Sequence, residues 1–246
     1  MKKLSFLLVA VMALTMSSCI NLLEELTLKK DGSGSYNLTF DMSSLMSDDF
    51  LKGMLQESAK ENEATKELSE NLEKDTIIFL KDMPMEAKQK TGRPEFWNNV
   101  KIHMKMSEKE EKFFTSIQLN FDKLSDIDFF YKNLSTLMEE NAESMGNGMI
   151  PNELLPGGAL FKYDKKKLVR LPAPKSQTNA AEDENMEMFK MFFSSATYTS
   201  VYNLPGRVTK TNMADAEIDG NTVKVSSSLM DMMEGKSKAQ GEIRFK

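Results

Sequence analysis

Alternating apolar and polar positions near the start of the chain predict two strands joined by a tight turn. Between residues 26 and 40, every second residue from Tyr36 to Phe40 is apolar, and the turn sequence Asp31–Gly34 comes before this run. A period of two places side chains on one face of a strand, and Asp-Gly supplies the positive φ angles that a tight turn needs. Capping residues and apolar residues at near-helical spacing then predict a helix over 41–55.

A similar pattern recurs further along the chain. Apolar residues alternate over Val100–Met106 and again over Phe113–Phe121, around the charged sequence EKEEK, and a helix pattern follows. The stretches LTFDMSSLMSDDFLK and LNFDKLSDIDFFYK align at a shared Phe-Asp pair. We therefore predict an internal repeat over 22–72 and 98–143, although capped strand-to-helix junctions can also converge without common origin.

The remaining pattern adds further strands and one strongly apolar helix. TIIFLKDMP, from Thr76, predicts a buried strand that ends at Pro84, and ALFKYDKKKLVRLP predicts a hairpin. Met and Phe residues crowd the helix predicted around residue 190, and Asp219–Asn221 turns a hairpin in the last third. The predicted fold class is α+β, with antiparallel sheets, helices on one face, and repeated strand-strand-helix units.

The N-terminus combines a positive segment with an apolar run that is too short to span a bilayer. Lys2 and Lys3 precede this run, and small residues precede Cys19. The order is typical of a signal peptide over residues 1–18. The run from Met16 to Cys19 resembles the lipobox of bacterial lipoproteins. That resemblance implies a diacylglycerol on the thiol, cleavage before Cys19 and acylation of the new amine.

Cys19 is the only cysteine of the chain, which supports lipid attachment. The alternative is a plain secretory signal followed by an unpaired thiol, which would be open to oxidation and intermolecular pairing. Several acyl chains anchor stably, because each buried methylene contributes about 0.8 kcal/mol. The residue after Cys19 is Ile20, and not the Asp that retains many lipoproteins in the inner membrane. We therefore expect residues 19–246 to form one lipid-anchored domain of the cell envelope, at the outer membrane where the cell has one.

Charge and residue usage narrow the possible functions. Loss of Lys2 and Lys3 takes the formal net charge from −5 to −7, and an acidic surface argues against nucleic acid as a partner. His103 is the only histidine and is expected on the polar face of its strand. Without a second histidine or a free thiol, the common catalytic triads and zinc sites cannot be assembled, so we expect no catalytic residue, metal or cofactor. A carboxylate-dependent hydrolase of envelope polymers is the alternative.

The segment NLPGRVTKTNMADAEIDGNTVKV resembles the closing section of LppM-type bacterial lipoproteins. The matching residues are Leu204, Pro205, Gly206, Val208, Asn212, Gly220 and Val223. LTLKKDGSGSYNLTFDMS also looks like that family's first hairpin after the lipid cysteine. The resemblance implies an antiparallel sheet that grips helices, in a protein that handles lipid-like molecules at the envelope rather than catalysing a reaction.

The apolar helix around residue 190 supplies the candidate ligand-facing residues. Because it presents Phe and Met around most of its surface, it must be covered by sheet, and flexible Met side chains let such a cover open around a ligand. A solid core is the alternative. The candidate lining residues are Met188, Phe189, Phe192, Phe193, Leu119 and Phe121. We expect a non-enzymatic lipoprotein that binds an apolar or lipid-like ligand, or an envelope partner protein.

Overall fold

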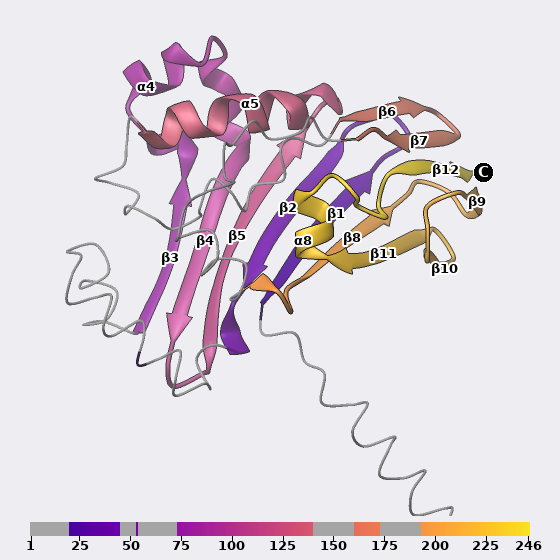
Figure 1. The fold of residues 1–246 in the computed structure, drawn as a ribbon. Coiled ribbons are helices and arrows are strands. Elements are labelled where there is room, and N and C mark those ends of the chain that lie inside the picture. The colour runs from indigo at the N-terminus through magenta and orange to yellow at the C-terminus, as the bar shows by residue number, and fades with distance from the viewer. Residues whose placement is uncertain (1–19, 45–52, 54–72, 140–159, 173–192) are drawn as a thin grey trace, which may run out of the picture.

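Two β-sheets and a few short helices pack around one hydrophobic core in the computed structural model of the protein (Figure 1). The structure describes residues 20–44, 53, 73–139, 160–172 and 193–246. Strands dominate these residues, and helices add to them, so the α+β class predicted from the sequence is confirmed at that level.

The larger sheet has eight strands in the order β10-β11-β8-β1-β2-β5-β4-β3. Their bounds are β1 Asn21–Leu28, β2 Gly34–Asp41, β3 Glu73–Phe79, β4 Val100–Ser107, β5 Lys112–Phe121, β8 Thr197–Asn203, β10 Glu217–Asp219 and β11 Thr222–Ser228. Neighbouring strands are antiparallel except for β1 and β8, which pair in parallel. The expectation of a purely antiparallel sheet is wrong at this pair, because β8 joins β1 through a long crossover of the chain instead of a hairpin.

The smaller sheet has four strands in the order β6-β7-β12-β9. Their bounds are β6 Phe161–Asp164, β7 Lys167–Arg170, β9 Val208–Thr211 and β12 Gly241–Phe245. The α-helices are α4 Met85–Lys90, α5 Ser125–Glu139 and α8 Leu229–Met233, and the 3-10 helices are η2 Leu80–Asp82 and η3 Pro94–Asn99.

The smaller sheet and α5 cover the same face of the larger sheet. Glu24 of β1 lies directly opposite Leu38 of β2, so the two side chains share a face, which we call the inner face. Arg170 of the smaller sheet contacts Glu24, and Tyr131 of α5 contacts Tyr36, which also lies on the inner face. Figure 1 shows α5 crossing the strands of the larger sheet, with β6 and β7 beyond one end of the helix.

The predicted hairpins form where the turn residues predicted them. β1 and β2 pair along their full length, and Gly32 in their turn adopts a φ of 89°, which a residue with a side chain rarely adopts. β4 and β5 form the second hairpin, and α5 follows it as predicted. Most of the helix predicted over 41–55 lies outside the described residues, so the strand-strand-helix repeat stays a prediction.

The strand predicted from Thr76 forms as β3, but it is not buried. β3 is the last strand of the larger sheet and pairs only with β4. Ile77 and Phe79 point away from the core, with exposed fractions of 49% and 44%. A short apolar run does not distinguish a buried strand from an edge strand, because its length and residue types suit both.

Candidate functional site

The most polar point of the core is an ion pair between the two sheets. Glu24 of β1 and Arg170 of β7 pair with side chains that are 0% and 6% exposed. Tyr36 donates a hydrogen bond of 2.6 Å to the Glu24 carboxylate, and Ser200 donates one of 2.8 Å. Tyr198 donates a third. The carboxylate is therefore surrounded by donors and has no contact with solvent.

The guanidinium of Arg170 is equally well satisfied. It donates hydrogen bonds of 2.7 Å to the Tyr198 hydroxyl and 2.8 Å to the Tyr202 hydroxyl. Tyr131 of α5 completes the cluster through a hydrogen bond with the Tyr36 hydroxyl. One network therefore ties together β1, β2, β8, the smaller sheet and α5.

The electrostatics of this cluster favour a fixed charge state. Burial alone would raise the pKa of the Glu24 carboxyl, but the charge of Arg170 and the three donated hydrogen bonds outweigh it, so the pKa lies below the usual 4.5. Burial raises the pKa of the surrounding tyrosines, which are Tyr36, Tyr131, Tyr198 and Tyr202. A charged pair inside a ring of neutral phenols suits a structural role, because no member is poised to exchange a proton near neutral pH.

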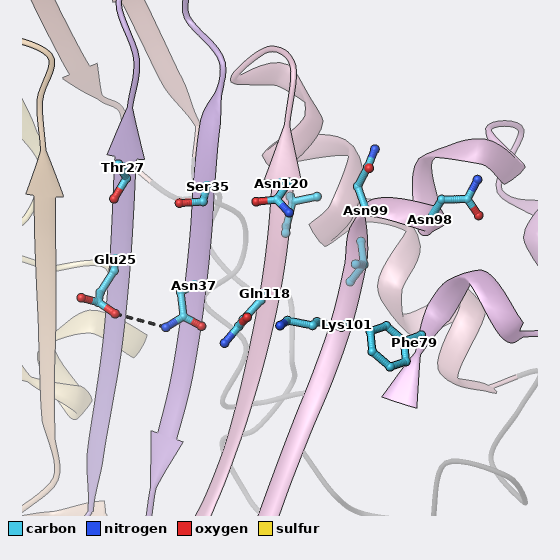
Figure 2. A pocket seen from close by; sticks show the side chains of 12 residues that line it. Glu25, Thr27, Ser35, Asn37, Phe79, Asn98, Asn99, Lys101, Gln118 and Asn120 are labelled. Atoms are coloured by element: carbon cyan, nitrogen blue, oxygen red, sulfur yellow. Dashed lines mark hydrogen bonds between the residues drawn. The ribbon is translucent and has the colours of Figure 1, made fainter. Parts of the chain in front are cut away.

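The candidate binding site lies on the opposite, outer face of the larger sheet. A groove of about 460 Å³ lies there, and its lining includes residues of β1, β2, β3, β4 and β5. Figure 2 shows the side chains that line it. One row of its lining runs straight across the sheet, because each residue lies opposite the next in register. The row is Glu25, Asn37, Gln118, Lys101 and Phe79.

A second row lies nearer the ends of the strands. Thr27, Ser35 and Asn120 face one another across β1, β2 and β5. Asn98 and Asn99, from the end of η3, extend the lining past β4 (Figure 2). The groove is thus lined mainly by carboxamide and hydroxyl groups.

Among the contacts of the described residues, hydrogen bonds to the groove's carboxamide side chains are found at Asn37 alone. Asn37 donates a hydrogen bond of 3.1 Å to Glu25 and accepts one of 2.8 Å from Ser116. Gln118 and Asn120, by contrast, form no side-chain hydrogen bond within the part of the chain that the structure describes. Their donors and acceptors are available to a ligand.

One of the sequence-predicted ligand residues, Leu119, is among the residues that line the groove, but its side chain lies on the inner face, opposite Tyr36. Leu119 and Phe121 are buried on the inner face, at exposed fractions of 1% and 3%, and pack in the core. Phe193 is half-buried against the same core. Met188, Phe189 and Phe192 lie outside the described residues, as does Cys19, so the apolar cavity stays a prediction.

His103 lies on the outer face of β4, as its position predicted. Its Nε2 is 2.8 Å from a carboxylate oxygen of Asp75, and its ring meets the Phe114 ring edge-on. The hydrogen bond from His103 lowers the pKa of the exposed Asp75 carboxyl. Asp75 and Phe114 thus fix the orientation of the His103 ring.

We expect His103→Ala to change the free energy of unfolding by no more than about 1 kcal/mol, because hydrogen-bonded polar pairs at the surface contribute little. Urea unfolding of the variant and the wild type at neutral pH measures the difference. A loss of several kcal/mol would show that this pair has a larger role than its exposure indicates.

The positions of His, Cys, Asp and Glu side chains bear on metal binding and on carboxylate chemistry. They contain no group of three or more His, Cys, Asp or Glu side chains that could hold a metal ion. Glu25 is the single carboxylate among the groove's lining residues. Within the described ranges, no helix is both long and apolar enough to cross a membrane.

Comparisons with known proteins give a match among solved structures. No family model matches the chain, and no curated protein matches it. Among solved structures, the chain is similar to the folded domain of LppM from Mycobacterium tuberculosis, determined by NMR. The TM-score is 0.42 at 9% sequence identity, over 92% of this chain and 90% of that one. The LppM domain is a member of the family that the sequence motifs resemble.

Proposed function

We propose that the protein is a lipid-anchored envelope lipoprotein that holds a non-catalytic binding domain directly at a membrane. The observation that carries this proposal is the start of the fold. β1 begins at Asn21, two residues after Cys19, and Ile20 is already buried at 4% exposure. An acylated Cys19 therefore leaves almost no linker between the lipid and the larger sheet. Ile20, the residue after Cys19, also supports placement at the outer membrane, because it is not the Asp that retains lipoproteins in the inner membrane.

The direction of β1 separates the groove from the anchor. Glu25 and Thr27 follow Asn21 by four and six residues. At about 3.3 Å per residue, Thr27 lies about 20 Å along the strand from the anchored end. The groove is then on the half of the sheet away from Cys19, where a ligand or partner outside the bilayer can reach it.

The groove favours recognition of a polar ligand or a partner surface over the apolar ligand that the sequence suggests. An apolar ligand beside Leu119 and Phe121 would have to displace side chains that pack in the core. Hydrolysis with two carboxylates needs a facing pair about 5–9.5 Å apart. The groove lining includes only Glu25, so no observation favours the hydrolase.

Cys19→Ser is expected to abolish lipid attachment, because the thiol accepts the diacylglycerol and cleavage follows only after it is modified. Cells are labelled with a palmitate analogue, and the protein is then followed in membrane and soluble fractions. We expect the variant to be unlabelled and to persist as an unprocessed or unanchored chain. Ser18→Ala is the matched control and should be labelled like the wild type. Labelling of the Cys19→Ser variant would refute the anchor.

We also propose that the two hairpins are copies of one unit, because the sheet register supports the alignment of the two stretches. Aligning Phe40 with Phe121 makes Asn37 equivalent to Gln118. These two residues lie opposite each other, and so do Gly34 and Phe121. A local two-fold axis through the Asn37–Gln118 pair therefore relates β2 to β5. Distant homologues in which the two hairpins are no more alike than here would count against duplication.

A further inference from the structure

We propose that the outer groove binds a neutral carbohydrate chain. The proposal specifies the ligand class of the binding domain, and it does not depend on the lipid anchor. It rests on three features of the groove: the chemistry of its lining, the position of its unpaired polar groups, and the length of the first row.

The lining chemistry matches sugar hydroxyls. Five carboxamides line the groove, which are Asn37, Asn98, Asn99, Gln118 and Asn120. Each carboxamide both donates and accepts hydrogen bonds, and so does each hydroxyl of a sugar. The lining has one positive and one negative side chain, Lys101 and Glu25, so it offers neither the cationic cluster that a phosphate needs nor a largely apolar wall for an acyl chain.

The unpaired groups are concentrated where a ligand would lie. Gln118 stands at the centre of the first row, between Asn37 and Lys101 (Figure 2). Asn120 stands beside it in the second row, and both side chains lack hydrogen-bond partners within the described residues. Asn37, held by Glu25 and Ser116, supplies a fixed group next to these free ones. A ligand rich in hydroxyl groups satisfies them without displacing any existing contact of Gln118 or Asn120.

An aromatic ring closes one end of the row. Phe79 is 44% exposed on the edge strand β3, directly opposite Lys101. Lys81 lies over the ring, with its Nζ 5.2 Å from the ring centre. This cation–π contact favours the observed orientation of the ring. An exposed aromatic beside a row of amides provides an apolar contact for the C–H face of a sugar ring, while the amides bind its hydroxyls.

The dimensions favour a chain of sugars over a single one. The first row spans five adjacent strands, β1, β2, β5, β4 and β3. At about 4.8 Å between strands, the row is about 19 Å long. The groove volume of about 460 Å³ is in the usual range for small-ligand sites, which is about 300–1,000 Å³.

The test is an NMR titration of the full processed chain, labelled with ¹⁵N, in which the Asn and Gln side-chain amides report directly. The probes are three neutral tetrasaccharides: cellotetraose, maltotetraose and tetra-N-acetylchitotetraose. We expect at least one of them to shift the signals of Gln118 and Asn120, with a dissociation constant on the order of millimolar. Vesicles of phosphatidylcholine should leave these signals in place.

Two variants locate the binding. Gln118→Ala combined with Asn120→Ala should weaken binding about tenfold, because it removes hydrogen bonds that nothing else on the sheet replaces. Gln89→Ala, an exposed amide on α4 outside the groove, should bind like the wild type. Because these positions are on the surface, the fold should survive, and the wild-type titration stands without the variants.

Three results would overturn the carbohydrate proposal. They are no shift of the groove amides with any of the three tetrasaccharides, shifts that the double variant retains unchanged, or shifts caused by vesicles alone. The result of the Cys19 labelling experiment does not affect these readouts. The lipid-anchor proposal and the carbohydrate proposal can therefore be refuted independently.

Discussion

Arg170→Ala is expected to lower the free energy of unfolding by about 3–5 kcal/mol, the range measured when one partner of a buried ion pair is removed. The variant leaves the Glu24 carboxylate charged in a site with 0% exposure. Three hydrogen-bond donors remain, from Tyr36, Tyr198 and Ser200, but the compensating positive charge is gone. The carboxylate must then take up a proton or admit water, and both disturb the contact between the two sheets.

Urea unfolding at neutral pH, followed by circular dichroism, measures this loss. Arg244→Ala is the matched control, because Arg244 also pairs with a glutamate but is 61% exposed, and we expect a change of about 1 kcal/mol or less. Replacing both partners, with Glu24→Leu and Arg170→Met, should recover part of the loss, since no lone charge is then buried. Equal effects of Arg170→Ala and Arg244→Ala would show that the buried pair does not hold the sheets together.

The sequence predicted local pairing well because the signals for it are local. Asp31–Gly34 and Asp219–Asn221 each turn a hairpin where the turn residues stand. The sequence could also have indicated that Glu24 is buried, because Glu24 lies on the apolar face of β1 between Leu22 and Leu26. An acidic residue in such a phase requires a buried partner.

The partner itself could not be predicted from the chain. Arg170 is 146 residues from Glu24, and it reaches Glu24 only because the smaller sheet packs on the inner face. The parallel pairing of β1 with β8 is equally non-local. No periodicity encodes which distant strands become neighbours, because the period fixes only which face a side chain occupies.

The groove was missed for a related reason. Alternation correctly places Asn37 and Gln118 on the polar phases of β2 and β5. The polar face of a strand is ordinarily a solvated face, so the positions of these residues did not indicate a binding site. Only the strand order and register place Asn37, Gln118 and Lys101 in one row. The exposure of Phe79 likewise depends on β3 being an edge strand, which the apolar run itself does not indicate.

The protein is expected to lose stability steeply above about pH 10, because burial raises the pKa of four clustered tyrosines above their usual 10.0. In the unfolded chain these phenols ionise near pH 10, whereas in the folded chain they stay protonated. The unfolded state then binds fewer protons than the folded state, so the free energy of unfolding falls as pH rises. Each such tyrosine contributes up to about 1.4 kcal/mol per pH unit.

Urea unfolding midpoints measured from neutral pH to above the usual tyrosine pKa test this expectation, with tyrosinate absorbance recorded on the same samples. Absorbance should rise together with unfolding, because the four phenols ionise only when the cluster opens. Tyr198→Phe should make the alkaline fall shallower, since one buried phenol is gone. Tyr163→Phe, which removes a tyrosine outside the cluster, should change it less. Ionisation of most tyrosines in a chain that is still folded would mean that the Glu24–Arg170 cluster is open to water. The two sheets would then have to be held together by apolar packing without this polar network.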